Sequence, residues 1–296
     1  MYEVIIVGGG PAGLSAATTL GRCRRRVLVC DDGNYRNEAS GALHGFLSRD
    51  GIHPAELRRI GREQLARYDV EYREAHVASA ACIEGGFAIT LEDGAKLACR
   101  VLLLATGVVD HIPKTEGFER LFGAGVFHCP YCDGWEVREQ LLAAYGRGRN
   151  GAGLAEELKT WSGNVALCTD GPGNLAAADR ARLKTLGIAV HETRIARLEG
   201  TEHLERIVFH DGTLLECRAL FLSTGQRQRS DLAATLGCAF TREGAVRTGK
   251  MEMTNVQGLF VVGDASRDVQ FAIVAAAEGA RAALAINRAF VRNNGR

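Results

Sequence analysis

Two cysteines, Cys129 and Cys132, stand either side of a Pro-Tyr pair, with His128 directly before them and Asp133 directly after. The C-x-x-C spacing suits a metal site, a structural disulfide or a thiol pair that carries electrons. A structural zinc needs four ligands, and the chain has no second C-x-x-C and no close histidine pair. A structural disulfide across two residues would close only a small loop and add little stability. The spacing therefore favours a redox-active pair over the other two interpretations.

The residues around the pair suit thiol chemistry. Pro130 stiffens the turn, and a helix that begins at the pair would lower a thiol pKa through its N-terminal dipole. Asp133 is then a candidate proton relay for the formation and release of a thiolate. The other cysteines stand singly in apolar or mixed surroundings, and we interpret them as small buried hydrophobic residues. They are Cys23, Cys30, Cys82, Cys99, Cys168, Cys217 and Cys238.

The start of the chain carries a nucleotide-binding pattern. Gly8, Gly10 and Gly13 form G-x-G-x-x-G between an apolar run and a segment with helical spacing. The first glycine allows a tight turn, the second lets a pyrophosphate approach the backbone, and the third lets helix and strand pack closely. Asp31 ends the next apolar run, where an acid can accept from a ribose hydroxyl. This combination predicts a dinucleotide-binding unit.

The same glycine spacing recurs at Gly146, Gly148 and Gly151, again between an apolar run and a helical pattern. The following strand ends at Asp170, at the position that selects between NAD and NADP. An acid there disfavours a 2′-phosphate, and no arginine pair follows to hold one. Two interpretations stay open: this half binds NADH, or it keeps the fold without using a nicotinamide.

The elements between these motifs predict an α/β protein with two Rossmann-like dinucleotide-binding domains, the second inserted into the first. Residues 34–51 predict a long functional loop, 70–100 a small antiparallel sheet with a hairpin at Glu-Asp-Gly-Ala, and 269–292 a long alanine-rich helix. Because that last helix needs a sheet to pack on, we assign it to the first domain. The predicted boundaries are 1–115 plus 243–296 for the first domain and 116–242 for the second.

The composition limits the partners of this chain. Its 296 residues carry a net charge of +1, with acidic and basic residues spread along the whole length. No basic stripe indicates nucleic acid, and no polybasic arm indicates an anionic membrane. The apolar start is too short for a signal peptide or a membrane span, and no later run is long enough. We therefore expect a cytoplasmic protein without a metal, a nucleic acid or a membrane partner, acting on a small molecule or a protein thiol.

Four segments together resemble a known family: VIIVGGGPAGLSAA, LLLATG, CPYCDG and TNVQGLFVVGDA are similar to the low-molecular-weight thioredoxin reductases. The resemblance spans essentially the whole chain, and it implies FAD in the first domain, a redox disulfide on the second, and a homodimer. It also implies that Cys132 faces the flavin, that Cys129 exchanges with substrate, and that Asp133 is the acid and base. The residues that it places at the FAD are Gly8, Gly10, Pro11, Ala12, Gly13, Asp31, Asp32, Asn37, His44, Thr106, Gly107, Gly263, Asp264, Phe271 and Ala272.

The sequence differs from these reductases at two places. CTDGPG stands where the reductases carry a basic His-Arg-Arg cluster, and Gln270, Phe271 and Ala272 stand where they carry Arg-Gln-Ala. The loop around His44 and the cysteine segment are similar to a sister group that includes the FAD-dependent dithiol oxidases. Those enzymes close disulfides in natural products such as gliotoxin and holomycin and pass electrons to oxygen. His44 and His128 are candidates to assist thiol deprotonation, against the alternative of solvated or packing histidines.

Three hypotheses about function result. The leading one is an FAD-dependent thiol–disulfide oxidoreductase that oxidises a dithiol through Cys129 and Cys132, with oxygen as acceptor. It is favoured because the nicotinamide motif lacks the basic residues that would bind a phosphate. The second is an NAD(P)H-dependent disulfide reductase that serves thioredoxin or a similar small protein. The third, from another class, is a catalytically idle flavin-binding regulator.

Overall fold

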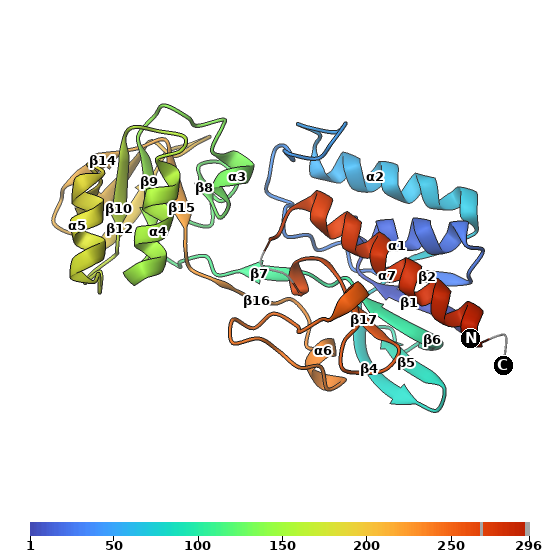
Figure 1. Cartoon of the computed structure of the whole chain (residues 1–296). Coiled ribbons are helices and arrows are strands. Elements are labelled where there is room, and N and C mark those ends of the chain that lie inside the picture. Colours follow the sequence, from blue (N-terminus) through green and yellow to red (C-terminus); the bar gives the residue numbers. More distant parts are fainter. Residues whose placement is uncertain (267–268, 294–296) are drawn as a thin grey trace. The chain divides into compact units, whose positions relative to one another are not determined.

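The chain folds into two compact units in a computed structural model that describes residues 1–266 and 269–293 (Figure 1). The first unit comprises Met1–Glu38, Gly45–Val109 and Arg227–Arg296, and the second comprises Ala39–His44 and Asp110–Gln226. Each unit has its own sheet and its own buried core. The predicted α/β fold with two Rossmann-like units is confirmed.

The first unit is built on a seven-stranded sheet with the order β3-β2-β1-β6-β5-β4, in which β17 also pairs with β6. The pairs that join β1, β2, β3, β6 and β17 are parallel, whereas β4, β5 and β6 form an antiparallel meander. The strands are β1 (Tyr2–Val7), β2 (Val27–Asp31), β3 (Glu71–Glu74), β4 (Val77–Ile83), β5 (Gly86–Leu91), β6 (Lys96–Leu104) and β17 (Leu259–Val261).

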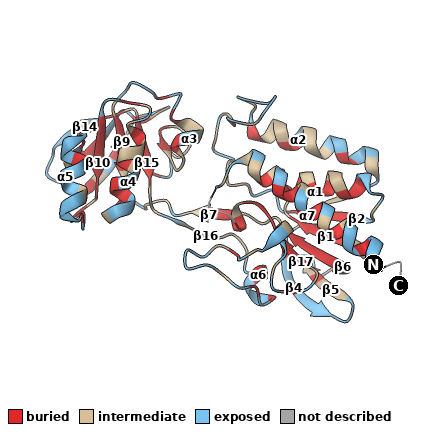
Figure 2. Ribbon diagram, in the orientation of Figure 1, coloured by how far each residue is buried: buried red, intermediate tan, exposed pale blue. Residues whose placement is uncertain are grey.

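Helices cover this sheet, and β1 is apolar along most of its length because both of its faces are buried (Figure 2). Ile5 and Ile6, neighbours on β1, lie in two different cores. Helices α1 and α7 pack so closely that a Cβ at Gly279 would lie 2.0 Å from the carbonyl oxygen of Ala12, so only glycine fits there. The helical elements are α1 (Pro11–Arg22), α2 (Pro54–Leu65), η1 (Ala66–Tyr68), α6 (Leu232–Thr235), η2 (Lys250–Glu252), η3 (Gly263–Ala265) and α7 (Ala272–Asn293).

The second unit has a five-stranded parallel sheet with the order β11-β10-β9-β15-β8 and a separate three-stranded antiparallel sheet. The first sheet contains β8 (Val126–Phe127), β9 (Leu142–Tyr145), β10 (Val165–Cys168), β11 (Ala189–His191) and β15 (Ala219–Leu222), and the second contains β12 (Ile195–Glu199), β13 (Arg206–Phe209) and β14 (Leu214–Glu216). Its helices are α3 (Pro130–Asp133), α4 (Gly148–Leu158) and α5 (Ala177–Thr185). A two-stranded pair, β7 (Val108–Asp110) and β16 (Gln226–Gln228), contains the two boundaries at residues 109/110 and 226/227. None of the helices in the described part of the chain is long and apolar enough to span a membrane.

The division into units differs from the predicted boundaries. Residues 227–242 belong to the first unit, because Leu232 and Cys238 are buried in one of its cores. Ala39–His44 belongs to the second unit, where a Cβ at Gly123 would lie 2.2 Å from the carbonyl oxygen of Ala39. Apolar residues at 232–238 therefore pack against the first sheet rather than extend the inserted domain.

The predicted small antiparallel sheet is partly wrong. Strand β3 pairs in parallel with β2, so it extends the main sheet, and only β4 to β6 are antiparallel. These strands also join the main sheet, because β6 pairs with β5 through its first half and with β1 from Cys99 onward. A nine-residue strand is long enough to serve both neighbours.

The prediction for the lone cysteines is also wrong in part. Five of them are buried, but Cys23 and Cys82 are exposed. Cys23 follows the last turn of α1, and Cys82 lies on β4, which ends the sheet and presents most of its side chains to solvent. Burial raises the pKa of Cys217 to about 12, which keeps that thiol protonated and unreactive.

Candidate active site

The cysteine pair lies at the junction between β8 and the short helix α3. Cys129 immediately precedes α3 in extended conformation, and Pro130 occupies the first helical position, where its missing N–H costs nothing. The backbone N–H of Cys132 donates to the carbonyl oxygen of Cys129 at 3.2 Å, which closes the turn that brings the two residues together. The predicted helix at the pair is therefore present as a single turn.

Both cysteines of the pair are partly exposed. A hydrogen bond from the Cys132 side chain lowers the pKa of the Cys129 thiol, although burial opposes this shift. The buried lone cysteines show the reverse, since desolvation raises the pKa of Cys30 to about 11. At Cys129 hydrogen bonding outweighs burial and favours a thiolate.

Asp133, directly after the pair, has an environment suited to proton transfer. Burial raises the pKa of its carboxyl group to about 7, the Glu136 carboxylate adds to the rise, and His44 opposes it. His44 Nε2 lies 3.5 Å from Glu136 Oε1. A carboxyl group that titrates near neutral pH can both accept and return a proton, and the role of Asp133 as a relay stays a prediction.

His128 lies on the other side of the pair in sequence. Its Nδ1 is 3.9 Å from Asp110 Oδ2, and its ring stacks on Phe122 with 6.2 Å between centroids. The carboxylate and the ring fix the orientation of the imidazole, as a carboxylate does for many histidines that handle protons. Both candidate histidines of the sequence therefore have carboxylate neighbours in the second unit.

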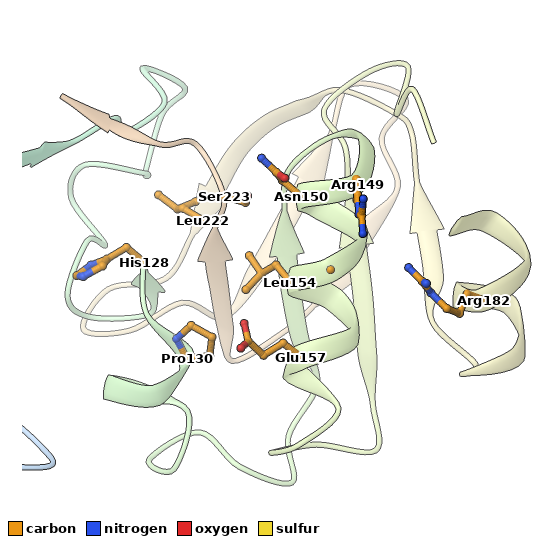
Figure 3. A pocket seen from close by; sticks show the side chains of 10 residues that line it. His128, Pro130, Arg149, Asn150, Leu154, Glu157, Arg182, Leu222 and Ser223 are labelled. Carbon is orange, nitrogen blue, oxygen red and sulfur yellow. The ribbon is translucent and has the colours of Figure 1, made fainter. Parts of the chain in front are cut away.

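A pocket of about 610 Å³ opens beside this segment, within the second unit (Figure 3). Leu154 of α4 and Leu222 of β15 give it an apolar part, and His128 and Pro130 form the side next to the cysteine pair. The remaining lining residues are Arg149, Asn150, Gly153, Glu157, Arg182 and Ser223. A pocket of this size and mixed character suits a small organic molecule.

The first glycine turn has the form that a pyrophosphate needs. Gly8 has φ +108°, and a Cβ there would lie 2.3 Å from the carbonyl oxygen of Ala105, so only glycine fits. A Cβ at Gly13 would lie 1.9 Å from the Gly8 oxygen, which explains the close packing of α1 on β1. At Gly10, by contrast, no atom of residues 1–266 and 269–293 lies within 4 Å of the Cβ position. The turn is therefore an open cradle at the start of a twelve-residue helix that has no side-chain cap.

Asp31 is positioned differently from its predicted role as a ribose ligand. One of its oxygens accepts from the Gly9 N–H at 2.9 Å, and the other accepts from the hydroxyls of Tyr35 and Tyr72. The carboxylate is 4% exposed, so in this structure it braces the glycine turn. Its contact with a ribose stays a prediction.

The other predicted flavin residues lie in the first unit, with one exception. Asn37 Oδ1 accepts from Arg58 at 3.1 Å, and Asp264 accepts from Arg36 at 2.8 Å. The exception is His44, which belongs to the second unit and contacts Glu136. The remaining members are placed as follows: Asp32 is 3.1 Å from His76, Thr106 and Gly107 follow β6, Gly263 donates its N–H to Glu278 at 2.8 Å, and Phe271 and Ala272 stand at the start of α7.

The second glycine turn has the close packing expected of its spacing, because a Cβ at Gly151 would lie 2.4 Å from the carbonyl carbon of Gly146. Asp170, the predicted selectivity residue, accepts from the Tyr145 hydroxyl at 3.0 Å and from the Ile195 N–H at 2.8 Å. Both carboxylate oxygens of Asp170 therefore accept hydrogen bonds from residues of the second unit. Over residues 1–266 and 269–293, no group of three or more His, Cys, Asp and Glu side chains could hold a metal ion.

Sequence reasoning missed three residues of this region. Glu136 and Asp110 place carboxylates beside His44 and His128, and Arg147 lies inside the second glycine turn. A weak signal existed for Glu136, which follows Asp133 by three residues and so can share its side of a helical turn. Asp110 gave none, because only the fold brings its strand next to the cysteine segment.

Comparisons with known proteins place the chain among disulfide-handling flavoproteins. The family model described as pyridine nucleotide-disulphide oxidoreductase matches residues 2–279. A "probable thioredoxin reductase" of Arthroderma benhamiae is 32% identical over 305 residues, covering 90% of this chain and 74% of the relative.

Two solved structures have the same fold throughout. The oxidoreductase from Agrobacterium tumefaciens superposes with a TM-score of 0.92 at 33% identity, covering 98% of both chains. The structure of HlmI superposes with a TM-score of 0.94 at 30% identity, covering 99% of this chain and 93% of that one.

Proposed function

Because the chain belongs to the pyridine nucleotide-disulphide oxidoreductase family, we propose that it oxidises small-molecule dithiols to disulfides, with FAD as cofactor and oxygen as acceptor. It is a thiol–disulfide oxidoreductase, and FAD is the cofactor of its family. The observation that carries the proposal is the Cys129–Cys132 pair followed by Asp133, whose pKa is raised to about 7. The open cradle at Gly10 fits the FAD pyrophosphate.

The chemistry begins with the pair as a disulfide. Asp133 takes the proton of a substrate thiol, and the thiolate attacks the Sγ of Cys129, so the bond between the two cysteines breaks and Cys132 leaves as a thiolate. The second substrate thiol then passes its proton to Cys129 as its sulfur attacks the substrate sulfur of the mixed disulfide, which forms the product disulfide and releases Cys129 as a thiol. The substrate has lost two electrons and two protons, and the pair has gained the two electrons.

Each residue near the pair has a defined task in this sequence. Asp133 holds the transferred proton, and burial, with a smaller contribution from the Glu136 carboxylate, raises its pKa to about 7. FAD, when bound at the first glycine turn, supplies the two-electron acceptor that regenerates the disulfide, and oxygen is reduced to hydrogen peroxide. The pocket beside His128 and Pro130 would accommodate a small substrate. A small molecule is therefore favoured over a protein as the source of the thiols.

Oxygen consumption tests this proposal. Flavin-loaded protein mixed in air with dithiothreitol, without any nicotinamide, should consume one oxygen for each dithiol oxidised. Cys132→Ser should abolish the uptake, whereas Cys23→Ser, at an exposed cysteine outside the site, should leave it unchanged. Uptake that persists in Cys132→Ser would contradict the proposal. Persistence in Cys129→Ser as well would favour the idle flavin-binding protein.

A second candidate, an NAD(P)H-dependent reductase of a thioredoxin-like protein, is favoured by one observation. Tyr131 and Trp135, beside the pair, are 62% and 64% exposed, which is unusual for large aromatic residues and typical of a surface that contacts protein. Insulin reduction with thioredoxin and NADPH separates the candidates. The reductase predicts turnover in that assay, and the oxidase predicts none.

A further inference from the structure

The second glycine turn, unlike the first, is covered by its own chain at Gly148, whereas Arg149 and Asn150 of the same turn line the pocket described above. The N–H of Gly148, which corresponds to Gly10 in the spacing, donates to the carbonyl oxygen of Gly173 at 2.7 Å. The carbonyl oxygen of Asn174 would lie 3.7 Å from a Cβ at Gly148, where nothing lies within 4 Å of the Cβ position at Gly10. A dinucleotide uses this N–H to bind its pyrophosphate, and a carbonyl oxygen in its place also repels a phosphate.

A side chain closes the neighbouring part of the same site. Arg147, the residue between the first two glycines, donates from Nε to the carbonyl oxygen of Thr169 at 2.8 Å and from its guanidinium to that of Asp170. The guanidinium thus lies across the end of β10, and its Nη2 would be 3.4 Å from a Cβ at Gly171. In a Rossmann fold the adenosine ribose occupies this position. The corresponding residue of the first turn is Gly9, which has no side chain to place there.

Hydrogen bonds hold this cover in place. The N–H of Gly173 donates to Glu192 Oε1 at 3.0 Å, and Arg180 pairs with the same carboxylate at 2.7 Å. The hydroxyl of Thr169 donates to the carbonyl oxygen of Gly171 at 2.6 Å. The segment Gly171–Asn174 is therefore held by the strands that flank it. The acidic residues at the ends of β2 and β10 do not distinguish the two sites. Asp31 and Asp170 both already accept hydrogen bonds from their own unit.

We propose that the second Rossmann fold is closed against NADH and NADPH by Arg147 and by the segment Gly171–Asn174. Arg147 is then a specificity-determining residue, because its side chain decides which electron donors the protein can use. This inference deepens the proposed function and rests on it. With the nucleotide site closed, substrate thiols are the source of electrons for the cysteine pair. The family's nicotinamide does not fit the residues present.

Equilibrium dialysis of the flavin-loaded protein against NADH and NADPH tests the closure. Wild type should show no saturable binding up to about 1 mM. The double variant R147A/E192Q removes the side chain and the anchor of Gly173, and it should bind at least one nucleotide with a Kd of about 0.1 mM or tighter, which is tenfold below the wild-type limit. R120A is the matched control, since Arg120 also donates to a main-chain carbonyl of the second unit, that of Gly200, but away from the turn.

Micromolar binding by wild type would overturn the inference, and weaker binding in R147A would then make Arg147 a phosphate ligand. A double variant that keeps its fold by circular dichroism but binds no better than wild type would also overturn it. Oxygen uptake with dithiothreitol, measured on the same samples, separates the two claims. Nucleotide binding together with dithiol oxidation refutes only the closure, and a closed site without dithiol oxidation refutes only the proposed function.

Discussion

The two dinucleotide folds of this chain share one glycine spacing but differ in what lies against the second glycine. At Gly10 no atom of the described residues lies within 4 Å of the Cβ position, whereas at Gly148 the N–H is already bonded to the carbonyl oxygen of Gly173. The residue before that glycine is Gly9 in one turn and Arg147 in the other. The spacing G-x-G-x-x-G therefore secures the packing of helix on strand in both units, but an open phosphate site in only one. A glycine motif of this spacing therefore predicts the strand–turn–helix fold more reliably than it predicts a bound dinucleotide.

If the second unit does not bind a nicotinamide, its task is thiol chemistry. The largest expected effect is therefore the loss of dithiol oxidation when the cysteine pair is changed. Cys132→Ser removes one sulfur of the pair, so no disulfide can form and dithiol-dependent turnover should fall by on the order of a thousandfold or more. Flavin content should stay at the wild-type level, since the predicted cofactor residues other than His44 lie in the first unit. Stopped-flow absorbance with dithiothreitol measures both. Turnover within about tenfold of wild type would remove the pair from the mechanism.

A substitution at Gly10 tests the open cradle directly. A Cβ there meets no atom within 4 Å, so Gly10→Ala should leave the folded protein intact but place a methyl group in the path of the pyrophosphate. Flavin affinity should fall by about a hundredfold, read from the 450 nm absorbance retained after dialysis. Gly163→Ala, at another unobstructed glycine, is the control. Full flavin retention in Gly10→Ala would place the cofactor elsewhere.

Asp133→Asn sharpens the assignment of proton transfer. The amide cannot accept a proton, so the rate of dithiol oxidation should fall by about a hundredfold. In wild type the rate should rise with pH as the carboxyl group, with its pKa of about 7, becomes an acceptor, and this limb should disappear in the variant. The rate is measured by oxygen uptake between pH 5 and pH 9. An unchanged limb would assign it to another group.

Glu136→Gln should have a smaller effect of defined sign. The Glu136 carboxylate raises the pKa of Asp133, so its removal should move the pH-rate limb to lower pH and leave the plateau rate nearly unchanged. His44→Gln should move the limb the other way, because His44 opposes the rise. Shifts in the same direction for both variants would contradict the electrostatic explanation.

The smallest effect is on stability. The pKa of Asp133 is higher in the folded protein than in the unfolded chain, so its contribution to stability is present below about pH 4 and is lost as the pH rises through about 7. Asp133→Asn should therefore stabilise the protein at pH 8, on the order of 1 kcal/mol after solvent screening, and change little at pH 4. Thermal unfolding at both pH values measures the difference. Equal shifts at the two pH values would exclude a titration effect.

The sequence was informative wherever one local pattern decides the outcome. The two glycine turns, the helix at Pro130 and the pair itself depend on residues within a few positions of each other, and each was predicted. The cover of the second turn was not, because it joins Gly148 to Gly173, two residues brought together only by the fold. For the same reason the sequence did not predict the contact between His44 and Glu136, because these residues are 92 positions apart in the chain.

Errors in the fold prediction came from strands whose neighbours are distant in sequence. The segment Glu71–Glu74 lies next to a hairpin in the chain, yet it pairs in parallel with Val27–Asp31. The polar residues of this edge strand do not indicate which strand it pairs with, because two of its four residues are exposed to solvent. Cys82 was misplaced for a related reason: β4 is an edge strand with most of its side chains exposed, and a single cysteine does not show that its strand lies at the edge of the sheet.

In the proposed mechanism, electrons enter the protein through its cysteine pair and not through its second Rossmann fold. An anaerobic titration of the flavin-loaded protein measures this directly, with flavin absorbance followed against added reductant. We expect complete bleaching after two equivalents of dithiothreitol, one for the pair and one for the flavin, and no bleaching by NADH or NADPH. Rapid bleaching by one equivalent of NADPH, with none by dithiothreitol, would contradict it.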